Sequence, residues 1–156
     1  MKHSGFTLIE VLVTITIITI LASIVIPLSQ VSIKRSKEME LRQDLRMIRT
    51  AIDEYKRAWD EGKIKRSIGE SGYPPALKTL EDGVVNAQFP DGSRIRFIRK
   101  VPRDPLNGDS SAEPHETWGL RSYESGPDDP KEGADVFDVY SKSEEVAIDG
   151  TLYRDW

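Results

Sequence analysis

The chain has no cysteine and only two histidines, His3 and His115. The absence of cysteine excludes disulfides and thiolate metal sites, and it leaves the redox compartment open. The sequence also has no glycine-rich phosphate loop and no metal-binding pair of histidines, and the spacing of its carboxylates singles out no acid–base pair. We therefore expect a protein that is not an enzyme and that requires no cofactor.

Charge is missing from one long segment near the N-terminus. Glu10 is followed by 23 uncharged residues, Val11 to Ile33, and the next charge is Lys34. A helix of this length rises ~35 Å at ~1.5 Å per residue, which is enough to cross a hydrocarbon core of ~30 Å. Residues 34–156 are far more polar and are long enough to form one domain with a single core.

Two ordinary interpretations of the apolar segment leave features unexplained. A secretory signal has an apolar core of ~7–15 residues with a small-residue cleavage site after it, whereas this run is longer. A plain transmembrane anchor accounts for the length but not for Glu10. A charged carboxylate costs ~2.5–3.5 kcal/mol at mid-bilayer and less near the edge, so Glu10 needs a partner.

The segment GFTLIEVLVTITIITILASIVIP, residues 5–27, resembles the class III signal and N-terminal helix of type IV pilin-like proteins. The resemblance implies that a prepilin peptidase cuts between Gly5 and Phe6 and methylates the new N-terminus of Phe6. Glu10 is then the fifth residue of the mature chain, where the family has its acid. Pro27 is the twenty-second, where the family commonly has a helix-breaking proline.

The new amine of Phe6 and the carboxylate of Glu10 would neutralise each other in an apolar filament core. Breaking such a buried pair costs about 3–5 kcal/mol, so the pair would set the register of stacked helices. The amine belongs either to a neighbouring subunit or to the same chain, because Glu10 lies four residues from Phe6. Pro27 removes a backbone donor, and we expect either a simple kink or local melting that lets the helix lengthen in an extended filament.

A second helical pattern follows the apolar segment. Apolar residues recur at spacings of three and four: Leu41, Leu45, Ile48, Ile52, Tyr55 and Trp59. This period predicts one apolar stripe that packs on the chain's own sheet, and it covers too few heptads to favour a coiled coil. Charges occupy the other faces: Arg42, Asp44, Arg46, Arg49, Asp53, Glu54, Lys56 and Arg57. Gly62 and the polar residues after it end the helix.

Shorter elements follow, and together with the long helix they predict an α+β fold. YPPALKTLEDG predicts a short helix through Leu77 and Leu80 that Gly83 closes. Three segments predict strands: SRIRFIRK (93–100), TWGLRSY (117–123) and DVFDVYS (135–141).

The order of these motifs is similar to that of the major pseudopilin of type II secretion systems. Its most distinctive part is P-x-D-P-x-x-G, at Pro102, Asp104, Pro105 and Gly108. The resemblance covers most of the chain and implies a pilin-like lollipop, in which the C-terminal half of one long helix packs on an antiparallel sheet of about three strands. It implies three parts: a leader at 1–5, a transmembrane and assembly helix at 6–33, and a periplasmic globular domain at 34–156.

Members of that family often bind calcium in the loop after the VYS strand, where this chain has SKSEEVAIDGTLYRDW. By position, the resemblance places Glu145 and Asp149 near the acidic ligands and Lys142 near a backbone-carbonyl ligand. Calcium takes about six to eight oxygen ligands, and only two or three plausible side chains are present. Either a calcium site or a solvated acidic loop fits this segment. We expect Trp156 to plug the core of the sheet.

Charge is unevenly distributed along the polar part of the chain. Residues 34–103 hold 17 Lys and Arg against 11 Asp and Glu, whereas residues 104–156 hold 4 against 14. Regions of opposite sign suit head-to-tail packing into a filament, although ordinary surface charge gives the same counts. The basic residues are interleaved with acids, so we expect no nucleic-acid partner.

The resemblance implies a structural subunit that assembles into a periplasmic pseudopilus and drives protein export across the outer membrane. Its partners would be copies of itself, the prepilin peptidase, minor pseudopilins, the inner-membrane assembly platform and, before assembly, membrane lipid. It would first cross the bacterial inner membrane once, with its N-terminus in the cytoplasm. The alternatives are a type IV pilin subunit for adhesion, motility or DNA uptake, and a membrane-anchored binding domain or enzyme.

Overall fold

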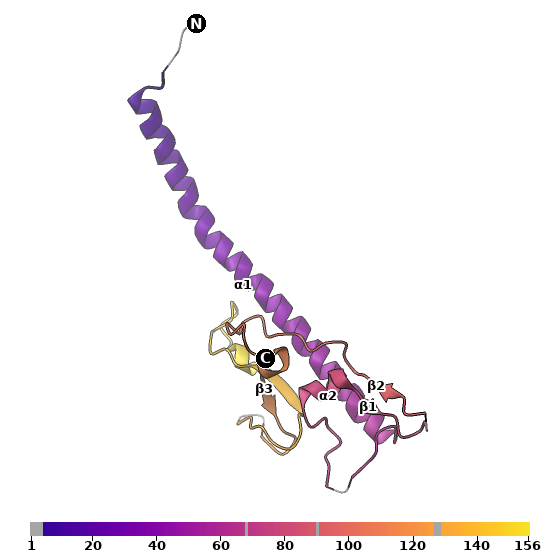
Figure 1. Cartoon of the computed structure of the whole chain (residues 1–156). Coiled ribbons are helices and arrows are strands. Elements are labelled where there is room, and N and C mark those ends of the chain that lie inside the picture. Colours follow the sequence, from indigo (N-terminus) through magenta and orange to yellow (C-terminus); the bar gives the residue numbers. More distant parts are fainter. Residues whose placement is uncertain (1–4, 68, 90, 127–128) are drawn as a thin grey trace. The chain divides into compact units, whose positions relative to one another are not determined.

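The computed structural model describes residues 5–67, 69–89, 91–126 and 129–156, so residues 1–4 of the expected leader lie outside the described residues. The chain forms two compact units, Met1–Ser36 and Lys37–Trp156. The second unit begins at Lys37. Helix α1 (Leu8–Asp60) contributes residues to both units (Figure 1).

In the first unit, α1 presents apolar side chains that are not buried. The exposed fraction is 83% for Phe6 and 43% for Val11, and the other large apolar residues up to Ile33 that the structure describes fall between these values. This helix is long and apolar enough to cross a membrane. The helix is continuous across Pro27, so it is not broken there in the single subunit. Melting in a filament under extension stays a prediction.

In the second unit, α1 supplies the core stripe that the sequence predicts. All six residues of the stripe are buried, from Leu41 at 0% exposed to Trp59 at 9%. The helix ends at Asp60, and the amide of Gly62 donates to the carbonyl of Trp59 at 2.9 Å. Gly62 has φ +71°, a conformation that favours glycine, so its role as the stop signal is confirmed.

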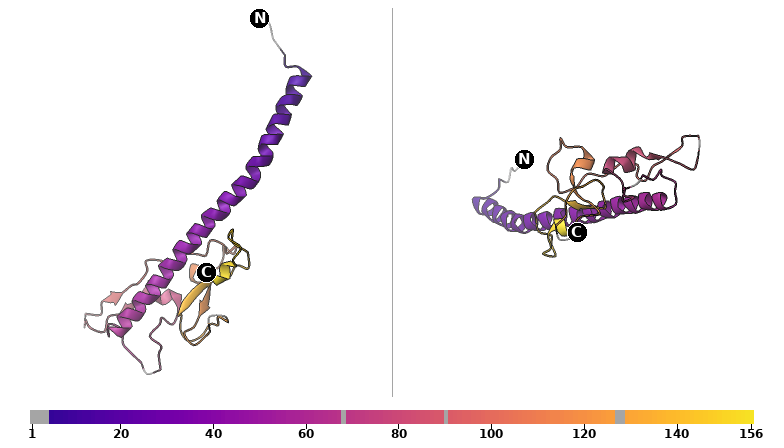
Figure 2. Two further views of the ribbon diagram at one scale, coloured as in Figure 1. Left: turned by 180° about the vertical axis from the view of Figure 1, so that it is seen from behind. Right: turned by 90° about the horizontal axis from the view of Figure 1, so that it is seen from below.

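The remaining elements are short. They are α2 (Leu77–Asp82), β1 (Val84–Val85), β2 (Arg94–Ile95), the 3₁₀ helix η1 (Pro114–Glu116), β3 (Trp118–Arg121), β4 (Asp138–Ser141) and the 3₁₀ helix η2 (Tyr153–Asp155). Within the second unit, α2, β1 and β2 lie toward the C-terminal end of α1, whereas β3, β4 and the C-terminus lie nearer its middle (Figures 1 and 2). The predicted helix through Leu77 and Leu80 is confirmed, with Gly83 at φ +74° directly after it.

The α+β class is confirmed, but the strands do not form one sheet of about three strands. Among the described residues, β1 pairs with β2, and β3 pairs separately with β4, both antiparallel. The strand expected over 93–100 is reduced to Arg94–Ile95. The reason lies in the next residues, because the amides of Phe97 and Ile98 donate to the carbonyl of Leu80 on α2 and turn the chain away.

Between β3 and β4 the pairing is close. Gly119 lies opposite Tyr140, and a Cβ atom at Gly119 would come within 2.4 Å of the Tyr140 ring. Glycine at position 119 therefore leaves room for the Tyr140 ring over β3. A side chain at this position would clash with that ring.

The charged faces of α1 are not all exposed. Asp44 is only 8% exposed, and Arg49 is half-buried. Burial, together with the negative charges of Glu40 and Asp104, raises the pKa of Asp44 to about 6. The neutral carboxyl group is therefore favoured in the folded domain relative to the unfolded chain.

Asp44→Asn is expected to stabilise the domain at neutral pH. Because the folded pKa is raised above the usual value of 3.8, the favourable contribution of Asp44 is present at low pH and is lost as the pH rises through about 6. We expect a gain on the order of 1–2 kcal/mol at pH 7.5, after allowance for partial exposure, and little gain at pH 4. Urea unfolding of the variant at both pH values measures this.

The matched control is Asp53→Asn, which removes the same charge from an exposed position on α1. A gain that is equal for Asp44→Asn and Asp53→Asn, or equal at both pH values, would contradict the assignment to burial of Asp44.

Candidate functional site

The junction between Gly5 and Phe6 lies just before α1 and is open. A Cβ atom built on Gly5 meets nothing within 4 Å, and Gly5 does not adopt a positive φ. The subunit's own fold therefore gives no reason for a glycine at this position. A requirement for glycine would have to come from another molecule that handles the junction.

Glu10 lies in the first turn of α1 with an exposed side chain. Its amide donates to Oγ1 of Thr7 at 3.3 Å, so Thr7 is the N-cap residue of the helix. We had not singled out Thr7, although the pattern T-x-x-E of a capping box was present in the sequence. The cap fixes where the helix begins, and so it fixes the place of Glu10 relative to Phe6.

Four hydroxyl groups inside the apolar segment are satisfied by the helix itself. Thr14 and Thr19 donate to the carbonyls of Glu10 and Ile15 at 2.6 and 2.8 Å, and Thr16 and Ser23 donate to backbone carbonyls in the same way. Such bonds remove the cost of placing hydroxyls in lipid. The carboxylate of Glu10 differs from these hydroxyls, because it carries a charge, whereas each hydroxyl donates to a carbonyl of its own helix.

Two of the three residues considered for calcium, Lys142 and Asp149, have side chains in contact with other groups. The ammonium of Lys142 donates to the carbonyl of Glu116 at 3.0 Å. One carboxylate oxygen of Asp149 accepts from the amide and hydroxyl of Thr151 at 3.0 and 2.7 Å, and the other lies 3.3 Å from the guanidinium of Arg42. These hydrogen bonds, with Arg42, lower the pKa of Asp149. The carboxylate of Glu145 is exposed.

Oxygen ligands for calcium do not gather here. Within the part of the chain that the structure describes, no group of three or more acidic or histidine side chains could hold a metal ion. The cation beside Asp149 is an arginine, which repels a second cation. Because calcium requires about six to eight oxygen ligands, this donor set does not fit it.

Two residues that sequence reasoning missed hold the C-terminal segment. Oε1 of Glu38 accepts from the amide of Ile148 at 2.8 Å and from the hydroxyl of Tyr153 at 2.9 Å. Arg42, one turn along α1, pairs with Asp149 and stacks over the ring of Trp156 at 4.1 Å. Their partners lie more than a hundred positions away, so no local pattern could reveal them.

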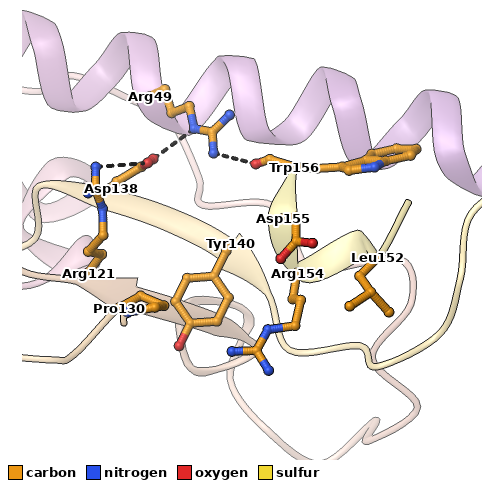
Figure 3. A pocket seen from close by; sticks show the side chains of 9 residues that line it. All are labelled: Arg49, Arg121, Pro130, Asp138, Tyr140, Leu152, Arg154, Asp155 and Trp156. Carbon is orange, nitrogen blue, oxygen red and sulfur yellow. Dashed lines mark hydrogen bonds and ion pairs between the residues drawn. The ribbon is translucent and has the colours of Figure 1, made fainter. Parts of the chain in front are cut away.

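Arg49 ties the end of the chain to β4 (Figure 3). Its guanidinium donates to Asp138 at 2.8 Å and to the carbonyls of Val139 and Trp156 at 3.1 and 2.6 Å. Arg121 approaches the other oxygen of Asp138 at 3.5 Å. Arg49 therefore joins α1, β4 and the last residue of the chain through one planar group.

Trp156 is not the core plug that the sequence suggested. It is only partly buried, and its indole donates to Oγ1 of Thr151 at 2.7 Å. Tyr153 is the fully buried residue, at 0% exposed, with its ring against Trp156. Burial and the hydrogen bond to Glu38 raise the pKa of Tyr153 to about 12.

Comparison with known proteins assigns the N-terminal segment first. Residues 1–26 match the family described as the prokaryotic N-terminal methylation motif. This match covers the Gly5–Phe6 junction and Glu10.

Relatives that match two thirds or more of the chain extend the comparison beyond this segment. The chain is 30% identical to the type II secretion system core protein G of Vibrio cholerae over 69% of this chain and 68% of that protein. It is 28% identical to the protein of the same name from Klebsiella michiganensis, over 81% and 85%, and 30% identical to that of Pseudomonas aeruginosa, over 67% and 68%. The chain belongs to the type II secretion system core protein G family. No solved structure matches it.

In this member of the core protein G family, the P-x-D-P-x-x-G motif is a turn beside the β3–β4 sheet, with Asp104 buried and Gly108 exposed. Asp104 is 1% exposed, and its carboxylate accepts from the amide of Leu106 at 2.8 Å and from the hydroxyl of Ser141 at 2.6 Å. The carbonyl of Pro102 accepts from the indole of Trp118 at 2.8 Å. The motif therefore fastens a loop to both strands of the sheet.

Proposed function

We propose that this chain is a structural subunit of a type II secretion pseudopilus, which polymerises through its N-terminal helix into a periplasmic filament. The observation that carries the proposal is the exposed apolar helix with a single acid in its first turn. Such a surface is stable only in lipid or against other copies of the same helix. Growth of the filament from the inner membrane would drive proteins across the outer membrane.

Assembly begins with removal of residues 1–5. Cleavage after Gly5 converts the amide of Phe6 into an amine, which is then methylated and carries a positive charge. The carboxylate of Glu10 neutralises that charge when the helix leaves the membrane and packs in the filament core. Pairing between subunits would set how far each new helix advances past the last one.

The membrane-anchored subunit has its N-terminus in the cytoplasm and its C-terminal domain in the periplasm. Cleavage and export therefore occur on opposite sides of the inner membrane. Its partners are copies of itself, the prepilin peptidase, minor pseudopilins and the inner-membrane assembly platform. The role is structural, with no catalytic step carried by this chain.

Replacing Gly5 tests the first step. Gly5→Ile is expected to block cleavage, because a branched side chain at the junction obstructs the peptidase although the subunit has room for it. The uncleaved chain should accumulate in the membrane, and secretion should be lost. The measurement is a Western blot for precursor and cleaved forms, with an export assay in a strain that lacks the chromosomal gene.

Gly5→Ala is the control, since alanine adds one methyl group and is expected to be cut. Efficient cleavage and export with Gly5→Ile would show that the peptidase does not require a small residue before the cleaved bond. Normal export in the strain that lacks the gene would contradict the proposed function itself.

A further inference from the structure

The C-terminal loop, residues 146–152, is a tight turn held by its own backbone. Val146 pairs with Leu152, and the amide of Ala147 donates to the carbonyl of Thr151 at 2.8 Å. Gly150 has φ +89°, and its amide donates to the carbonyl of Ala147 at 3.1 Å. The backbone of the turn therefore supplies its own closing hydrogen bonds.

The same loop is fastened to α1 by two side chains one helical turn apart. Glu38 is 9% exposed and accepts two hydrogen bonds, one from the loop amide of Ile148 and one from Tyr153. Arg42 places its guanidinium against Asp149 on one side and over the Trp156 ring on the other. A planar cation between a carboxylate and an indole is a favourable arrangement.

We propose that Glu38 and Arg42 take the place of a divalent cation in holding the C-terminal loop, so that this domain folds without calcium. Arg42 supplies positive charge beside Asp149, and Glu38 supplies the buried acceptor that orients the loop backbone. The two oxygens of Asp149 are thereby occupied by Thr151 and Arg42. The inference concerns folding of the domain and does not depend on filament assembly.

The first test is the melting temperature of the full-length chain in detergent micelles. All three tryptophans, Trp59, Trp118 and Trp156, lie in the second unit, so tryptophan fluorescence reports on that unit alone. We expect the same melting temperature in chelator and in millimolar calcium. A ligand at a hundredfold excess over its Kd would raise it by roughly 10 °C, and such a rise would overturn the proposal.

The second test replaces the cation. Arg42→Gln is expected to lower the melting temperature by a few degrees, in chelator and in calcium alike. The matched control is Arg46→Gln, which removes the same charge from an exposed position one turn along α1 and is expected to change little. Equal losses from both variants would show that Arg42 acts only through net charge, against the proposal.

A third measurement keeps the test independent of overall stability. Hydrogen exchange of the peptide that covers residues 146–152 should show protection of the Ile148 amide in chelator. Protection that is absent in chelator and appears only with calcium would show that a metal ion closes the loop.

Discussion

Glu10→Ala is expected to abolish filament assembly while leaving membrane insertion and cleavage intact. The apolar segment is unchanged and becomes more hydrophobic, so insertion does not depend on the acid. In the filament core, however, the amine of Phe6 would lose its counter-charge. The cost of about 3–5 kcal/mol for an uncompensated buried charge lowers the equilibrium constant for subunit addition a hundredfold or more.

Two further variants separate charge from shape at the same position. Glu10→Gln keeps the shape without the charge and should resemble alanine, whereas Glu10→Asp keeps the charge with a shorter reach and should be intermediate. Filaments sheared from cells that overproduce each variant measure assembly, and a Western blot for the cleaved form is the control. Normal filaments from Glu10→Ala would show that the acid does not set the register.

Asp104→Ala is expected to destabilise the globular domain by about 2–4 kcal/mol. The substitution leaves the amide of Leu106 and the hydroxyl of Ser141 without their acceptor, and each lost partner costs about 1–3 kcal/mol when buried. Relief of the repulsion between Asp104 and Asp44 offsets part of this loss. Urea unfolding of the full chain in detergent, followed by tryptophan fluorescence, measures the change.

Asp109→Ala is the matched control for Asp104→Ala. Asp109 also accepts hydrogen bonds within its own turn, from the amide and hydroxyl of Ser111, but it is exposed. Water can replace those bonds, so we expect a much smaller loss than for Asp104→Ala. Equal losses at the two positions would show that the burial of Asp104 is not what makes it important.

The helical parts of this fold could be predicted because their signals are local. Gly62 and Gly83 mark helix ends through backbone conformations that only glycine adopts easily, and the stripe from Leu41 to Trp59 repeats with the helical period. The sheets could not be predicted to the same degree. Strands of two residues, such as β1 and β2, are too short to carry a period, and β2 ends early because Phe97 and Ile98 bond to Leu80 of α2.

The polar contacts of the second unit were the least predictable. The sequence places Asp44 and Arg49 on the charged faces of the helix, but periodicity alone does not say which polar residues the rest of the chain will cover. Glu38 pairs with Tyr153 across 115 positions. In contrast, Gly5, Phe6 and Glu10 were predicted from a contiguous motif, and all three lie within residues 1–26, which match the N-terminal methylation motif.

The most direct test of the whole account is the intact mass of the subunits in sheared filaments. Cells that carry the prepilin peptidase and overproduce the wild-type chain should yield filaments. The chains in these filaments should lack residues 1–5 and carry one added methyl group on Phe6. Filaments built from chains that still begin at Met1 would contradict the account. Membrane protein from such cells that keeps residues 1–5 would contradict it as well.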